Sequence, residues 1–398
     1  MPKLRIVRMG AVEHTDRVGD TTVASGRDDG IDTGARGAFV VMDALRCVLA
    51  LMVAFAHAWY LLIADYPGQA TTIASAGYFL AGFAHASVIL FFVLSGYWIA
   101  KSVDRRMTAG WVWTGYTIDR LARLLVVLLP ALAIGGILDA IGLYGIESST
   151  HTGATDTYVL NNNLAERLGW QTLLGNILFL QSIAVAPFGT NGPLWSLAYE
   201  FWFYIWFPAL WVSWRSRRPS PLLATLLLAW IVPNMLVGFA CWLCGAALFW
   251  VTRRSGGQSL QPLRRLWLIV TSVPFLGTLI YSRLFGLGDV ELPLAFTFAV
   301  LLYTLLRVEL RAPRWLRPFA GYGAQASFSL YILHFPVIAF AAALLLDDKR
   351  LPATGASVML VVVVLVVAIL LSALFARYTE RHTARVRAFF SDGRPARI

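Results

Sequence analysis

Apolar residues fill long stretches of this chain, each about 20 residues in length, with short polar segments between them from about residue 41 to residue 377. A helix of about 20 apolar residues crosses a hydrocarbon core of roughly 30 Å and satisfies its own backbone hydrogen bonds there. The pattern therefore predicts an all-α, polytopic membrane helix bundle with about ten transmembrane helices. We place these helices at 41–64, 77–100, 120–144, 195–213, 221–236, 237–252, 266–285, 292–308, 323–346 and 354–377.

The distribution of basic residues predicts how these helices are oriented. If the N-terminus is cytosolic, the cytosolic segments and the helix ends beside them hold all but four of the 33 Lys and Arg residues. The exceptions are Arg167, Arg283, Lys349 and Arg350. By the positive-inside rule this asymmetry favours both termini in the cytosol, in agreement with an even number of spans.

The composition supports a membrane protein and excludes several other classes. Hydrophobic residues make up 58% of the chain and charged residues 14%, whereas soluble domains carry about a quarter charged residues. The net charge of +11 comes from short clusters between apolar stretches, so we expect the lipid bilayer as a partner and no nucleic acid. Cys47, Cys241 and Cys244 lie inside apolar segments, so neither a disulfide framework nor a metal site is predicted.

The segments outside the membrane define the predicted domain organisation. Residues 1–38 are rich in Gly, Asp, Thr and Arg, lack the apolar core of a signal peptide, and are predicted to form a disordered cytosolic tail. A transmembrane domain at 39–380 and a second cytosolic tail at 381–398 follow. The longest outer loop, about 145–194, is of a length that is usually functional or disordered. Its apolar part at 171–181 is too short to span, so we expect it to lie along the surface or to re-enter.

Ionisable residues inside membrane helices are costly and therefore indicate function. Arg46 and His57 are eleven residues apart in the first helix, which aligns them on one face about 16 Å apart along the axis. We expect Arg46 near the inner surface and His57 deep in the bilayer. The alternative is structural: Arg46 would anchor the helix to lipid headgroups, and His57 would bond a neighbouring backbone carbonyl.

Two further arginines extend this basic region. Arg120 and Arg123 are three residues apart and share a helix face. Because arginine binds phosphate bidentately, Arg46, Arg120 and Arg123 together predict a site for a nucleotide-type anion at the cytosolic surface. Alternatively, they are ordinary positive-inside residues.

Polar residues also stand in two other predicted spans. Glu200 lies among aromatic residues, where a carboxylate needs a partner or a raised pKa. Tyr331 and His334 lie three residues apart in another span, where a lone histidine is often structural.

Taken together, these motifs resemble the acyltransferase 3 family of integral membrane proteins, which acylate sugars and polysaccharides. The resemblance covers roughly residues 41 to 382. It rests on six segments in the family's order, DALRCVLALMVAFAHA, VILFFVLSGYWI, RLARLL, PLWSLAYEFWFY, SLYILHFPV and RYTER. In two places the chain departs from the family pattern: Ile89 stands where a polar residue is common, and the proline after the arginine-rich turn is delayed to Pro130.

The resemblance implies roles for individual residues. Arg46 and His57 match the family's paired Arg and His, with His57 catalytic, while Glu200 and Glu380 match two acidic positions. Other positions that fit the family pattern are Ser95, Gly96, Arg123, Trp195, Ser196, Tyr204 and His334. We expect Trp195, Ser196, Tyr204, Tyr331 and His334 to bind the acceptor substrate.

The resemblance further implies acyl-coenzyme A as the donor substrate and no tightly bound cofactor. We expect an O-acyltransferase of the bacterial cytoplasmic membrane that acylates a hydroxyl of a carbohydrate, glycolipid or glycoside. His57 would act as a general base or briefly carry the acyl group, of which we favour the base, and Glu200 would orient its imidazole or the acceptor. The alternative is a transporter or exporter, since intramembrane ionisable residues also relay protons or ions.

Overall fold

The computed structural model describes residues 33–160, 163–217, 219, 223, 230, 232–255, 260, 263–308 and 312–391. Within these residues the fold is all-α, as predicted, and no β-strand is present. The main helices are α1 (Thr33–Leu62), α2 (Thr72–Ala81), α3 (Ala84–Thr108), α4 (Trp113–Ala140), α8 (Trp195–Ser216), α10 (Pro233–Arg254), α11 (Arg264–Phe285), α12 (Glu291–Arg307), α13 (Leu316–Leu345), α14 (Gly355–Tyr378) and α15 (Thr383–Ser391). Between α4 and α8 lie a π-helical turn (Ile141–Gly145) and the short helices α5 (Ser149–Thr152), α6 (Leu164–Arg167) and α7 (Trp170–Ile177).

The structure confirms a multi-pass membrane bundle. Eight helices in the described part of the chain are long and apolar enough to cross a membrane. Helix α8 is not one of these eight. It has 22 residues, which is long enough, but its many tryptophans and tyrosines lower its mean hydropathy. The helix predicted at 221–236 lies mostly outside the described residues, but the predicted boundary at 236/237 is wrong, because α10 already begins at Pro233. The predictions for residues 1–32 and 392–398 also lie outside them.

The helix predicted at 77–100 is wrong in its first part. The chain forms α2 there, breaks at Gly82 and Phe83, and begins α3 at Ala84. The break has an identifiable cause, because Arg283 donates hydrogen bonds to the last carbonyls of α2, those of Tyr78 (2.9 Å) and Phe79 (2.7 Å). A Cβ atom at Gly82 would lie only 2.1 Å from the Arg283 guanidinium, so glycine makes room for this cap.

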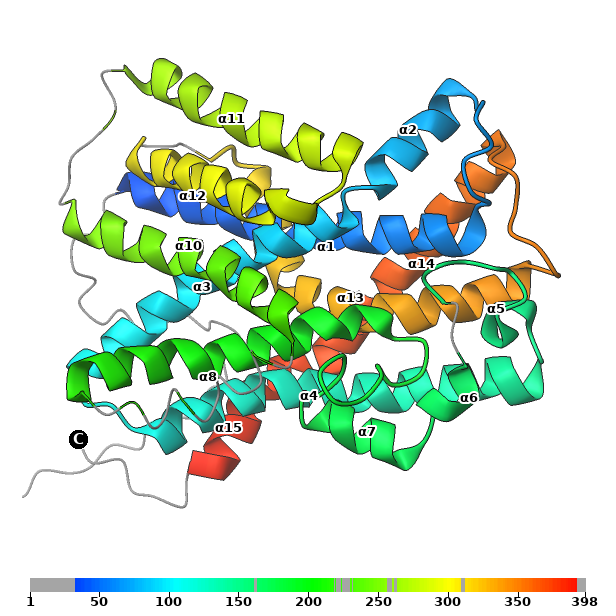
Figure 1. The fold of residues 1–398 in the computed structure, drawn as a ribbon, viewed down its shortest axis with the longest axis horizontal. Helices are drawn as coiled ribbons and strands as arrows, with labels where there is room; N and C mark the ends of the chain where they lie inside the picture. The colour runs from blue at the N-terminus through cyan, green and yellow to red at the C-terminus, as the bar shows by residue number, and fades with distance from the viewer. Residues whose placement is uncertain are drawn as a thin grey trace, which may run out of the picture. The chain divides into compact units, whose positions relative to one another are not determined.

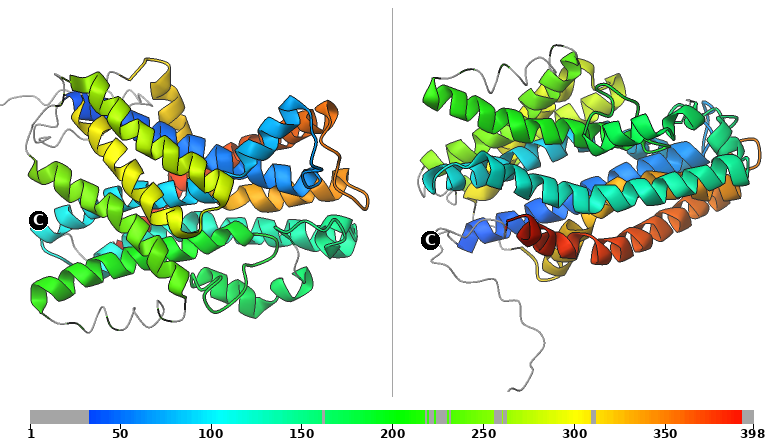
Figure 2. Two further views of the ribbon diagram at one scale, coloured as in Figure 1. Left: turned by 45° about the horizontal axis from the view of Figure 1, so that its top comes forward. Right: turned by 90° about the horizontal axis from the view of Figure 1, so that it is seen from below.

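Helix α1 lies between α13 and α3, and α13 packs in turn against α14 and α4 (Figure 1). Helix α11 sits at the periphery beside α12 (Figure 2). Helices α3 and α10 approach closely because Gly96 and Gly245 face backbone atoms of the other helix. A Cβ atom at Gly96 would lie 2.1 Å from the Trp242 carbonyl oxygen, as expected for helices that pack through small residues.

The two ends of the bundle have different polar networks. At one end, Asp104 pairs with Arg253, and Asp119 pairs with Arg106 and Arg387. We call this the basic end, and α1 and α4 begin there. At the other end, Arg350 binds Asp65 and the last carbonyls of α1. We call this the clamp end.

Four of the described long helices contain an internal proline, and at Pro208 and Pro336 a side chain repairs the hydrogen-bond ladder, because it bonds the carbonyl that the proline leaves without its helical partner. A proline has no N–H, so the carbonyl four residues before it loses its helical partner. Pro208 in α8 frees the carbonyl of Tyr204, which accepts a hydrogen bond from the Tyr116 hydroxyl at 2.9 Å. In α13, Pro336 frees the carbonyl of Ile332.

The donor for the Ile332 carbonyl is the side-chain amide of Asn191, at 2.8 Å. Asn191 is buried and belongs to the loop that precedes α8. The repairs therefore tie α4 to α8 and this loop to α13. Both repaired carbonyls lie beside residues that the sequence analysis placed in the site.

Candidate active site

Two histidines meet at the interface of α1 and α13. The Nδ1 atom of His57 lies 2.9 Å from the Nε2 atom of His334, and the rings stack with centroids 5.1 Å apart. His334 is fully buried, whereas His57 keeps part of its surface accessible. His57 also bonds the carbonyl of Val53, one turn earlier on α1, which is the contact that the structural alternative expected. The accessible part of the ring leaves room for another molecule.

The surroundings of His334 determine which nitrogens carry protons. Its Nδ1 atom lies 2.9 Å from the Leu330 carbonyl and 2.8 Å from the Tyr331 carbonyl, so it must donate to them. With both rings neutral, Nε2 of His334 is then an acceptor, and Nδ1 of His57 carries the proton that bonds it. The Nε2 atom of His57 is left with its lone pair, which is the form that a general base requires.

Next to His334, a tyrosine and a serine form a close hydroxyl pair. The Tyr331 hydroxyl and the Ser196 hydroxyl are hydrogen-bonded to one another, and both also lie within hydrogen-bond distance of the Pro193 carbonyl. Because each hydroxyl has one proton, one of them donates to its partner and the other to the carbonyl. This pair joins α13 to the beginning of α8. It brings together two residues that the sequence analysis assigned to acceptor binding.

Further along α8, Glu200 is held by hydroxyl groups. Its Oε1 atom accepts hydrogen bonds from Ser95 and Tyr204, each at 2.6 Å. The Trp242 indole donates to the Ser95 hydroxyl at 3.3 Å. The expected role of Glu200 in orienting the His57 imidazole is not supported, because the partner of that ring is His334. The second carboxylate oxygen of Glu200 has no hydrogen bond among the described residues.

Arg46 and Arg123 lie close to this carboxylate. Arg46 interacts electrostatically with Glu200, Tyr204, Asp43 and Arg123. Helix α1 begins at Thr33, so about 20 Å of helix precede Arg46. Arg46 therefore lies well inside its helix.

Arg123 is exposed although it lies on the inner face of α4. It is seven residues after Tyr116 and four before Val127, and both of these are fully buried, so the three share one face. Its side chain is thus accessible to a ligand although its neighbours on the same face are buried. Arg46 and Arg123 repel one another, and an anion between them would relieve this repulsion.

Arg120 is placed differently from the other two arginines. Its guanidinium stacks over the Tyr116 ring at 5.7 Å, and its buried Nε atom has no hydrogen-bond partner. It also interacts electrostatically with Arg123 and Tyr204. Arg120 therefore adds positive charge beside Arg123 and Tyr204, on the side toward the basic end.

Glu380, from the RYTER segment, completes this region. Its Oε1 atom accepts hydrogen bonds from the backbone N–H (2.9 Å) and hydroxyl (2.5 Å) of Ser329 in α13. It also interacts with Arg123 and Arg46. Glu380 thus balances part of the arginine charge and ties the end of α14 to the helix that carries His334.

Trp195 stands apart from the histidine pair. Its ring lies edge-on to His85 (5.7 Å between centroids) and to Tyr199 (5.2 Å). His85 in turn pairs with Glu291, 3.2 Å away. Of the expected acceptor residues, Ser196, Tyr331 and His334 lie together, Tyr204 lies beside Glu200, and Trp195 faces α3 and α12.

Four residues of this arrangement were not singled out from the sequence, namely Tyr116, Asn191, Trp242 and Ser329. A signal existed for two of them, Tyr116 and Asn191, since a proline inside an apolar helix leaves the carbonyl four residues earlier open to a donor from another element. The pattern does not say which residue supplies the donor. Trp242 and Ser329 are ordinary residues of apolar helices and carry no such signal.

The loop that carries Asn191 is held by a buried cluster. Asp139 accepts hydrogen bonds from the backbone N–H and hydroxyl of Thr190, and lies 3.4 Å from His151. The Ser148 hydroxyl is 2.8 Å from the other nitrogen of His151. The predicted outer loop is thus anchored to α4. Its apolar segment at 171–181 contains the short helix α7.

Comparison with known proteins relates this chain to one protein family. A sequence model described as an acyltransferase domain, that of the acyltransferase 3 family, matches residues 39–377. No curated protein and no solved structure gave a significant match to the chain. The matched range contains every residue of the site described above except Glu380.

Proposed function

The chain belongs to the acyltransferase 3 family and is a multi-pass membrane acyltransferase, and from this we propose that it transfers an acyl group from acyl-coenzyme A to a hydroxyl of a carbohydrate-type acceptor. The observation that carries the proposal is the pairing of His57 with His334. It leaves Nε2 of His57 unprotonated and His57 itself partly accessible.

In the proposed reaction His57 is the general base. Its Nε2 atom takes the proton of the acceptor hydroxyl as the hydroxyl oxygen attacks the thioester carbonyl carbon. The carbon–sulfur bond then breaks, and the leaving thiolate takes the proton back from the imidazolium. The products are an ester and coenzyme A thiol, and His57 returns to its starting form.

His334 acts as a positioning residue in this proposal. The hydrogen bond from Nδ1–H of His57 to His334 fixes the orientation and tautomer of the base. It also disperses the charge of the imidazolium that forms during the reaction, as a carboxylate does for other catalytic histidines.

The donor phosphates would bind Arg46, Arg120 and Arg123, on the side of the site toward the basic end. Arg46 and His57 are eleven residues apart on α1, or about 16 Å, so the acyl-bearing arm would run along this helix toward His57. Since basic residues favour the cytosol, we place the basic end in the cytosol of a bacterial cell and the clamp end outside the cytoplasmic membrane. Donor and acceptor would then approach His57 from opposite ends.

The test compares acylation with and without the protein. Protein in nanodiscs is supplied with acetyl- or succinyl-coenzyme A and a glycan extract, and both thiol release and the acceptor mass are measured. We expect thiol release that depends on the acceptor, together with a discrete acyl mass increase on a carbohydrate. An acyl gain on a lipid or protein instead would refute the carbohydrate acceptor. If the native protein transferred no more acyl groups than His57→Ala protein, the proposal would be refuted.

A further inference from the structure

A cavity of about 420 Å³ opens at the clamp end, between the last turn of α1, helix α2 and the loop that contains Tyr158. The size falls within the range of small-molecule sites, about 300–1,000 Å³. Its lining is strongly aromatic and comprises Trp59, Tyr60, Tyr66, Tyr78, Phe79 and Tyr158. This aromatic lining is separate from the histidine pair and the arginines of the active site.

The aromatic rings of the cavity form two groups with edge-to-face contacts. Tyr78 contacts Trp59 (5.0 Å between centroids) and Tyr66 (5.1 Å), both nearly perpendicular. Tyr60 and Tyr158 form the second group at 5.1 Å. Rings in edge-to-face contact keep part of their faces free for a ligand, and flat ring faces pack well against the C–H faces of pyranose rings.

The charged residues of the lining are both neutralised by protein partners. Asp65 is bound by two nitrogens of Arg350, each at 2.9 Å, and Arg283 is occupied by the carbonyls of Tyr78 and Phe79. The polar groups that remain are mainly tyrosine hydroxyls. Such a lining favours a neutral, hydroxylated ligand over an anion such as a phosphate.

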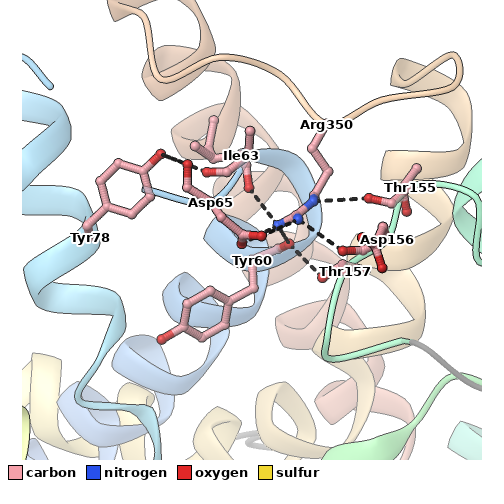
Figure 3. A network of polar contacts seen from close by, with 9 residues as sticks. Tyr60, Ile63, Asp65, Tyr78, Thr155, Asp156, Thr157 and Arg350 are labelled. Atoms are coloured by element: carbon pink, nitrogen blue, oxygen red, sulfur yellow. Dashed lines mark hydrogen bonds and ion pairs between the residues drawn. The ribbon is translucent and has the colours of Figure 1, made fainter. Parts of the chain in front are cut away.

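Arg350 holds the walls of the cavity in place (Figure 3). It donates to the carbonyls of Ile63 at the end of α1 and of Thr155 and Asp156 in the loop before Tyr158. Tyr78 is fixed by its own hydroxyl, which donates to the Ala64 carbonyl at 2.7 Å. The rings are therefore largely preorganised, which lowers the entropic cost of binding.

The cavity lies close to the proposed base. Tyr60 follows His57 by three residues, so the two side chains leave α1 about 60° apart and about 4.5 Å apart along its axis. A sugar held against Tyr60 would thus present its hydroxyls near the depth of His57. The arginine cluster lies toward the other end.

We propose that this aromatic cavity is the acceptor subsite and binds a neutral sugar ring of a glycan or glycoside. The proposal rests on the proposed function for the identity of the reaction, but the binding step needs neither donor nor catalysis. Tyr66 and Tyr158 are its most exposed aromatic members, at 53% and 65%, so we expect them to contact the ligand directly.

The binding test uses His57→Ala protein in nanodiscs without donor. Saturation-transfer NMR is recorded with neutral methyl glycosides of glucose, galactose, mannose and rhamnose. We expect transfer to the ring protons of at least one glycoside and at least a fivefold loss in the Tyr66→Ala/Tyr158→Ala double variant. The matched control is Tyr144→Ala, since Tyr144 is equally exposed, at 65%, but lies outside the cavity.

A kinetic test in the otherwise native protein completes the experiment. The double variant should raise the acceptor KM at least tenfold and leave the donor KM unchanged, while Tyr144→Ala changes neither. Glycoside binding without any acyl transfer would refute the proposed function and support the subsite. Acyl transfer with an unchanged acceptor KM in the double variant, or saturation transfer to lipid chains in place of glycosides, would overturn the subsite.

Discussion

His57 and His334 are 277 positions apart in the sequence, yet their rings stack, with Nδ1 of the first 2.9 Å from Nε2 of the second. The contact depends on two carbonyls of α13 that hold the far side of His334. One helix thus determines the tautomer of a base that belongs to another. In the same helix, the carbonyl freed by Pro336 is bonded by Asn191, which supports the turn that carries His334.

We expect His57→Ala to lower the turnover number at least a hundredfold, the usual scale of a general base. Both KM values should change little, because the arginines and the aromatic cavity remain. The measurement is steady-state kinetics on protein that remains monodisperse, since removal of a half-buried ring leaves a small cavity.

The control for this variant is His85→Ala on α3. His85 is half exposed, pairs with Glu291 and belongs neither to the histidine pair nor to the hydroxyl groups that hold Glu200. Its turnover should stay near that of the native protein. A well-folded His57→Ala protein with near-native turnover would return His57 to a structural role.

His334 should affect catalysis only through His57. His334→Phe keeps a ring but removes the acceptor for the Nδ1–H of His57, so we expect turnover to fall about tenfold or more, with KM values unchanged. In His334→Gln the amide oxygen can accept that hydrogen, and part of the turnover should return. Nitrogen NMR of ¹⁵N-histidine protein reports the tautomer directly. Equal turnover and the same His57 tautomer in the Phe and Gln variants would contradict the positioning role of His334.

The arginines should act on the donor phosphates alone. We expect Arg46→Ala and Arg123→Ala each to raise the KM for acyl-coenzyme A about tenfold, the scale of a lost charge-assisted contact. Acyl-pantetheine, which lacks the phosphates and the nucleotide, should be used equally well by these variants and the native protein. Arg254→Ala, an exposed arginine at the same end, is the control. Unequal use of acyl-pantetheine would assign the arginines to folding or chemistry instead.

The helices could be predicted because hydrophobic length alone determines most of them. Five of the nine predicted helices that have a described counterpart begin and end within four residues of the predicted bounds, and the other four differ by seven or eight residues at one end or both. The break between α2 and α3 could not, since its cause is Arg283, about 200 residues later in the chain. A local pattern carries no information about such a cap.

The site was only partly predictable for the same reason. Helical periodicity aligned Arg46 with His57, and the family motifs pointed to His334 and Glu200. Periodicity does not show which residues face one another across helices, so Glu200 was expected to orient either the His57 imidazole or the acceptor, and the contact of His57 with His334 was not predicted.

The orientation proposed for the bundle predicts the sides of its two ends. A reporter fused at Arg254 should be cytosolic, and a reporter fused at Tyr158 should be on the other side of the membrane. The reason is the excess of basic residues at the end that contains Arg254. Alkaline phosphatase activity, which requires export, distinguishes the two. Phosphatase activity of the fusion at Arg254 would place the basic end outside the cytosol and would contradict the proposed orientation.

The ion pair of Asp65 and Arg350 predicts an acid-dependent loss of stability at the clamp end. The hydrogen bond from Arg350 holds the pKa of the Asp65 carboxyl below its usual range. Because the folded-state pKa is lower than the unfolded value of about 3.9, the pair stabilises the fold fully above that value, and its contribution is lost as the pH falls through the folded-state pKa.

Asp65→Asn should therefore lower the thermal unfolding midpoint at pH 7 and have progressively less effect below pH 4. The Asp65 side chain is 77% exposed, so solvent screening should limit the difference to about 1 kcal/mol or less. Asp347→Asn, which changes an exposed acid on the same loop as Arg350, provides the control for a general charge effect. A midpoint difference between native and Asp65→Asn protein that stays constant from pH 7 to pH 3 would show that the carboxylate charge does not stabilise the clamp. The Arg350 guanidinium would then hold the loops through the backbone carbonyls alone.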